Sequence, residues 1–243
     1  LSNSHRDQLA KRWEKVHSKC VLVPPPPLLR MSPDNEGASR RGTREKLGLG
    51  QKDFLVAYFG YIYPSKGVET LFKAFQMVSN QRSNVRLILI GGILDREYPE
   101  HPSYARDLRE LPDQLGIQKN LIWIGEYATD SDEGSRFLRA ADTCVFSADP
   151  GVFLNNSSFA AAAAHGLPII ATKASMLEEP FLDRENVLLC PPKSPDSMAA
   201  AIMAIMDDPH LRSRLQQGAL ALASEWYSWE KAMDRIILTF GKA

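Results

Sequence analysis

Short apolar runs alternate with amphipathic stretches along most of the 243-residue chain. Seven of these runs are continuously apolar rather than alternating, which is typical of strands that are covered on both faces of a sheet. They span residues 19–23, 53–60, 85–92, 121–125, 143–148, 167–172 and 187–190. The pattern therefore predicts a buried, mostly parallel sheet of seven strands.

The segments between these runs carry apolar residues at helical spacing. In residues 68–80, Leu71, Phe75 and Val78 fall on one face of a helix. Residues 135–142 and 157–166 are also helical in pattern, with Ser157 or Ser158 expected to cap the second of these helices. Such strand–helix alternation predicts an α/β fold with a doubly wound, Rossmann-like sheet and helices on both of its faces.

Two further segments set the domain organisation. After Pro191 the chain is helical in pattern to its end, with Ser194 and Ser228 as expected N-caps. Residues 24–43 are rich in proline and then polar, which predicts a linker or surface loop. We therefore expect residues 1–43 to be the end of an upstream domain and its linker, and residues 44–243 to be one Rossmann-like domain with C-terminal helices.

Composition excludes some classes of partner. The 29 basic and 29 acidic side chains cancel, so charge gives no reason to expect nucleic acid or an anionic membrane surface. No apolar run approaches the roughly 20 residues of a transmembrane helix, and the start of the chain lacks the core of a signal peptide. The three cysteines have no CxxC spacing, which favours reduced thiols and a cytoplasmic protein. We expect no metal site.

Candidate binding residues follow the predicted strands, because ligands of open α/β sheets bind at the carboxyl ends of the strands. Glycine, lysine and helix N-termini there suit a phosphate group. Lys66 could instead be a solvated lysine, and residues 155–158 could be a plain helix cap. The GxGxxG and GxxxxGK[ST] phosphate loops are both missing. The candidates are Gly60, Tyr61, Lys66, Gly92, Glu126, Tyr127, Asn155, Asn156, Ser157 and Ser158.

Seven segments in order resemble one protein family. They are residues 58–75 (YFGYIYPSKGVETLFKAF), LILIGG, LIWIGEY, RFLRAADTCVFSAD, AAAAAHGLPIIAT, residues 185–215 and SWEKAMDRIILTF. Together they are similar to the C-terminal, nucleotide-sugar-binding half of GT-B glycosyltransferases, in the retaining group called family 4 or group 1. The resemblance covers nearly the whole chain.

The resemblance implies roles for single residues. Lys66 matches the lysine that binds the diphosphate of the donor, whereas Tyr61 stands where a second basic residue is usual. Phe153 and Ala161 stand where most members carry two glutamates, one near the donor sugar and one on the ribose hydroxyls. We expect residues 155–158 to take over part of the phosphate binding. No catalytic residue is assigned.

The resemblance also implies an activity, the transfer of a sugar from a nucleoside diphosphate sugar to an unknown acceptor, with retention and without a cofactor. The acceptor site would lie on a missing N-terminal domain, which could also bring the protein to a membrane periphery, and the present chain alone should be inactive. One alternative is a degenerate relative that serves as a binding or scaffold domain. The other is an unrelated Rossmann-type enzyme, such as a flavodoxin-like or epimerase-like domain.

Overall fold

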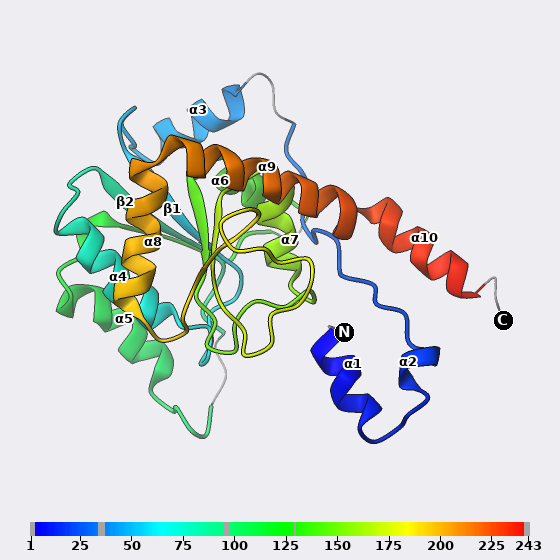
Figure 1. The fold of residues 1–243 in the computed structure, drawn as a ribbon. Coiled ribbons are helices and arrows are strands. Elements are labelled where there is room, and N and C mark those ends of the chain that lie inside the picture. Colours follow the sequence, from blue (N-terminus) through cyan, green and yellow to red (C-terminus); the bar gives the residue numbers. More distant parts are fainter. Residues whose placement is uncertain (1–2, 34–36, 95–97, 129, 241–243) are drawn as a thin grey trace.

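The computed structural model describes residues 3–33, 37–94, 98–128 and 130–240. Most of residues 37–226 fold around one parallel sheet, and the two ends of the chain lie apart from it (Figure 1). The order of its six strands is β3-β2-β1-β4-β5-β6. The predicted doubly wound, parallel α/β fold is confirmed. The strands are β1 (Phe54–Phe59), β2 (Val85–Ile90), β3 (Leu121–Gly125), β4 (Thr143–Phe146), β5 (Ile169–Thr172) and β6 (Leu188–Cys190).

The strand order reverses beside β1. β1 pairs with β2 along its whole length, from Phe54 opposite Val85 to Phe59 opposite Ile90. On its other side β1 meets β4 at two positions only, Val56 opposite Thr143 and Ala57 opposite Cys144. β2 and β3 lie on one side of β1, and β4, β5 and β6 lie on the other. A crevice opens where the direction reverses, at the carboxyl ends of β1 and β4.

Helices cover both faces of the sheet (Figure 1). Alternate residues of β1 point to opposite sides, so that Val56 belongs to one apolar core and Leu55 to the other. The first core contains α4 (Val68–Ser79), α5 (Tyr104–Gln114) and α8 (Pro195–Asp207). The second contains α6 (Glu133–Ala140) and α7 (Ser157–Ala164), and α9 (Pro209–Trp226) contributes to both.

The predicted helical tail is confirmed as α8, α9 and α10 (Trp229–Phe240). Both expected caps form, since Ser194 Oγ accepts from the Ser197 N–H at 3.4 Å and Ser228 Oγ accepts from the Lys231 N–H at 3.1 Å. α10 extends away from the body of the protein (Figure 1) and leaves Phe240 78% exposed. In the part of the chain that the structure describes, no helix combines the length and apolar character needed to cross a membrane.

The strand expected at residues 19–23 is wrong. The chain forms α1 (Asn3–Ala10) and α2 (Val16–Lys19) and then runs on without sheet pairing. Val21 is 53% exposed. The four prolines that follow, 24–27, lack the N–H donors that a strand needs inside a sheet. A short apolar run before prolines is therefore an extended surface segment here.

The loop expected at residues 24–43 is also partly wrong, because α3 (Ala38–Lys46) begins inside it. Polar contacts hold this helix on the protein. Asp142 Oδ1 lies 2.5 Å from Arg40 Nη2, its Oδ2 lies 3.2 Å from Arg44 Nη1, and the Leu55 N–H donates to Oδ2 at 2.7 Å. One carboxylate thus joins α3 to the start of β1 and the end of α6. The division of domains at residue 43 stays a prediction.

Candidate functional site

Two adjoining cavities occupy the crevice at the carboxyl ends of the strands. The first measures about 510 Å³ and the second about 260 Å³. They share five lining residues, which are Phe59, Gly60, Tyr61, Ser157 and Ser158. All ten candidate residues line one cavity or the other. The first cavity has Lys66, Asn155 and Asn156, the second has Gly92, Glu126 and Tyr127, and both share the remaining four.

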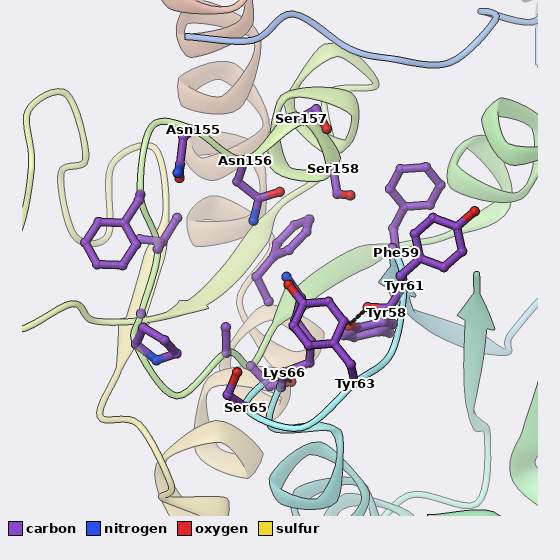
Figure 2. Close-up of a pocket in the computed structure, with 18 of the residues that line it drawn as sticks. Tyr58, Phe59, Tyr61, Tyr63, Ser65, Lys66, Asn155, Asn156, Ser157 and Ser158 are labelled. Carbon is purple, nitrogen blue, oxygen red and sulfur yellow. Dashed lines mark hydrogen bonds between the residues drawn. The ribbon is translucent and has the colours of Figure 1, made fainter. Parts of the chain in front are cut away.

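The loop from β1 to α4 carries Lys66 into the first cavity (Figure 2). Two hydrogen bonds from the β4 side hold this loop, because Ser147 Oγ donates to the Lys66 carbonyl and the Asp149 N–H donates to the Ser65 carbonyl, each at 2.9 Å. Gly67 has a φ of +65°, and a Cβ at this position would lie 2.0 Å from the Ser147 carbonyl oxygen. Only glycine allows so close an approach in this conformation.

The ammonium of Lys66 lies against an aromatic ring. Its Nζ lies 4.8 Å from the centre of the Tyr63 ring, which is within the range of a cation–π contact. Within the described residues, Lys66 Nζ has no carboxylate partner inside 4.0 Å. The charge is thus held in place without being neutralised, which leaves it available to an anion.

Two buried tyrosines donate hydrogen bonds to the backbone of the loop between β1 and α4. Tyr58 Oη donates to the Tyr61 carbonyl and Tyr104 Oη donates to the Tyr63 carbonyl, both at 3.1 Å. Burial raises the pKa of both phenols, so they remain protonated donors at neutral pH. The side chain of Tyr61, in the same loop, is 54% exposed and lines both cavities.

The N-terminus of α7 forms the opposite wall of the first cavity (Figure 2). The expected cap is wrong by one residue, since Asn156 Oδ1 accepts from the Phe159 N–H at 3.1 Å. The N–H groups of Ser157 and Ser158 make no hydrogen bond to any described residue. Free N–H groups at the positive end of a helix dipole favour an anion. Lys66 and α7 therefore face the same space.

The segment before α7 is fixed by a carboxylate that the sequence did not single out. Glu178 is 4% exposed, and its Oε2 accepts from the Leu154 N–H at 3.0 Å. Phe153, next to it, lines the first cavity. Ala161 is 0% exposed and belongs to the second core, not to the lining of either cavity.

Sequence reasoning missed several other lining residues. Tyr63, Ser65 and Ser147 have polar or aromatic groups at the first cavity, and each lies just after a strand, a position that could have indicated them. Leu28 and Leu29 of the proline-rich segment line the second cavity, and no local pattern predicts that contact.

A buried polar chain runs behind α7 to the N-terminal segment. Arg139 Nε donates to Ser32 Oγ at 3.1 Å. Ser32 Oγ in turn lies 3.1 Å from Ser135 Oγ, and Ser135 Oγ lies 2.7 Å from His165 Nε2. His165 Nδ1 lies 2.7 Å from the Ala161 carbonyl, which can only accept. The neutral imidazole with its proton on Nδ1 therefore fits, and burial lowers the pKa of His165 to about 4.

This histidine predicts a loss of stability in mild acid. Its folded pKa lies below the ordinary value of 6.5, so the unfolded chain binds the proton more readily between these values. Lowering the pH from 7.5 to 5 should cost about 2 kcal/mol through this group. Urea unfolding at both pH values should show a correspondingly smaller loss in His165→Gln. An equal loss in both proteins would contradict the assignment.

Comparisons with known proteins give the chain a place among characterised sequences. Residues 39–221 match the family described as "Glycosyl transferases group 1". The D-inositol 3-phosphate glycosyltransferase of Corynebacterium glutamicum is 30% identical over 82% of this chain and 45% of its own length. Such curated relatives are about twice as long as this chain, which spans 45% and 51% of the first two.

Solved structures share the fold. The C-terminal domain of LpcC, a glycosyl transferase group 1 family protein from Francisella tularensis, aligns with a TM-score of 0.65 and 23% identity, over 83% of this chain and 97% of that one. HepE from Anabaena, in a complex with UDP and glucose, aligns with a TM-score of 0.83 and 20% identity, over 100% of this chain and 62% of that one.

Proposed function

Since the chain belongs to the group 1 glycosyl transferases, we propose that it is the donor-binding half of a GT-B enzyme. The enzyme would transfer a sugar from a nucleoside diphosphate sugar to an acceptor and retain the configuration at the anomeric carbon. The observation that supports this most directly is the un-neutralised ammonium of Lys66, which faces the free N–H groups of α7 across one cavity. UDP in the HepE structure is consistent with a nucleotide ligand for this fold.

The chemistry of the proposed reaction needs a site for negative charge. As the bond between the sugar and the diphosphate breaks, charge accumulates on the departing phosphate oxygens. A fixed ammonium and helix N–H groups stabilise that charge without having to reorganise. Lys66 and the start of α7 would supply both, and the donor carries its own leaving group, so the reaction requires no cofactor.

The acceptor site belongs, in this proposal, to sequence outside the present chain. The curated relatives have about twice its length. α10 also leaves apolar side chains exposed, including Trp229 and Ile237, which a further domain could cover. We therefore expect the isolated chain to bind a donor without transferring its sugar.

Removal of the Lys66 charge tests the phosphate role. Calorimetric titration with UDP, GDP and ADP identifies the nucleotide that binds. Lys66→Ala should then weaken the binding of that nucleotide by about 1.5–3 kcal/mol, or roughly 10- to 150-fold. Lys73→Ala is the matched control, because Lys73 lies on the outer face of α4 and lines neither cavity. Equal affinities for the wild type and both variants would refute the phosphate role.

A second candidate is a domain that has kept the fold and lost the chemistry. It is favoured by the apolar residues Phe153 and Ala161 at the two positions where the family carries carboxylates. The full-length protein distinguishes the two functions. Transfer or slow hydrolysis of a bound nucleotide sugar would support the enzyme, whereas tight nucleotide binding without either reaction would support a binding or scaffold role.

A further inference from the structure

The two cavities carry opposite charges. Among the residues that the structure describes, Lys66 is the one lysine or arginine that lines the first cavity, and His5 is the one histidine. Glu126 is the carboxylate of the second, and no lysine, arginine or histidine lines that cavity among the described residues. Because five residues line both, a ligand that extends from one cavity into the other would pass from a positive to a negative environment.

The position of Glu126 is set by three glycines. Gly125 ends β3 with a φ of +73°, and its carbonyl accepts from the Gly91 N–H at 3.0 Å. A Cβ at position 92 would lie 2.5 Å from Glu126 Cγ and 2.9 Å from its Oε1. Glycine at position 92 thus leaves the space that the carboxylate occupies.

Glu126 also has open capacity for hydrogen bonds. Within the described residues, no cationic side chain lies inside 4.0 Å of it and no donor is bound to its carboxylate. Its side chain is exposed, so water occupies these positions in the free protein and a ligand with hydrogen-bond donors can replace it. An ionised carboxylate only accepts hydrogen bonds and repels phosphate oxygens. A nucleoside diphosphate would therefore place its phosphates by Lys66 and direct its nucleoside toward Glu126.

The donors nearest the phosphates of a nucleotide are the two hydroxyls of the ribose. In dinucleotide-binding Rossmann domains an acidic side chain at the carboxyl edge of the sheet accepts from a ribose hydroxyl, and Glu126 offers the same group at the same edge, although the chain lacks their GxGxxG loop. We propose that Glu126 accepts hydrogen bonds from the 2′- and 3′-hydroxyls of the nucleotide whose phosphates lie beside Lys66. This inference rests on the proposed function, and it holds for any base because uridine, guanosine and adenosine share the same diol.

The test compares each nucleoside diphosphate with its 2′,3′-dideoxy analogue in the wild type, Glu126→Ala and Glu126→Gln. Calorimetric titration of the wild type should show a roughly 10- to 100-fold loss on removal of the hydroxyls. In Glu126→Ala the two nucleotides should bind within about 3-fold of each other, and Glu126→Gln, which keeps one acceptor, should fall between. Glu110→Gln, at an exposed carboxylate of α5, should behave as the wild type.

Each outcome decides the matter. If removal of the two ribose hydroxyls weakens binding to Glu126→Ala as much as it weakens binding to the wild type, the inference is overturned. A loss of nucleotide affinity in Lys66→Ala in the same experiment would still support the proposed function. Weakening of GDP alone, with the diol effect intact, would show that Glu126 reads the base and would overturn the inference as well. If no nucleoside diphosphate binds the wild type, the proposed function and the inference both fail.

Discussion

Replacement of Asp142 by alanine should lower the free energy of unfolding by about 3 kcal/mol. The carboxylate binds Arg40, Arg44 and the Leu55 N–H at once, and its side chain is only 18% exposed. Alanine would leave the Leu55 N–H and the Arg44 guanidinium, whose side chain is 12% exposed, without this partner where water reaches poorly, whereas Arg40 is 37% exposed and can be hydrated. Urea unfolding at neutral pH measures the loss.

Two variants make that result specific. Asp142→Asn keeps an acceptor and should cost less than Asp142→Ala. Asp207→Ala removes a comparable pair with Arg82, at 3.0 Å, but both side chains are well exposed, so it should cost under about 1 kcal/mol. A similar loss in Asp142→Ala and Asp207→Ala would show that the contacts of α3 contribute no more than a surface ion pair.

Replacement of Gly67 by alanine should cost about 2–4 kcal/mol and also weaken nucleotide binding. The new Cβ would lie 2.0 Å from the Ser147 carbonyl, so the loop must move away from β4 and carry Lys66 with it. Backbone strain at positive φ adds about 1 kcal/mol to the overlap. Unfolding in urea and titration with the best-binding nucleotide measure the two effects.

Gly48→Ala is the matched control for this substitution. Gly48 has nearly the same φ, +68°, but a Cβ there meets nothing within 4 Å. It should therefore cost only the backbone strain, about 1 kcal/mol, and leave nucleotide affinity unchanged. Equal losses in the free energy of unfolding for Gly67→Ala and Gly48→Ala would mean that the close contact with Ser147 does not contribute to stability.

The fold could be predicted because its signal is local. Each strand from β1 to β6 is a mostly apolar run, interrupted by Arg86 in β2, and α4 shows helical spacing of buried residues. The pattern of each segment therefore predicts its structure without reference to the rest of the chain. The wrong strand at 19–23 has a similar apolar pattern, and the four prolines directly after it argue against a strand that continues into them. α3 was missed because Arg40 and Arg44 bind a residue about 100 positions away.

The site could be predicted in outline for a similar reason. Residues that follow parallel strands meet at one edge of the sheet, and all ten candidates do so. Their roles in binding stay predictions. The cap at Asn156 instead of Ser157 is an error of one position, typical of helix boundaries. The contact between Tyr63 and Lys66 depends on side-chain direction, which no pattern of residue types specifies.

The reversal of strand order beside β1 has a consequence for folding kinetics. β1 must find β4 across 87 residues of sequence, as the hydrogen bond from Leu55 to Asp142 shows, whereas β2 follows β1 after a single helix. Pairing across such a distance closes a long loop, so we expect it to form after the pairing of β1 with β2. The loop of Lys66 is held by Ser147 and Asp149, so we expect it to take shape only once that pairing is made. A bound nucleotide would consequently slow unfolding while leaving the rate of folding unchanged.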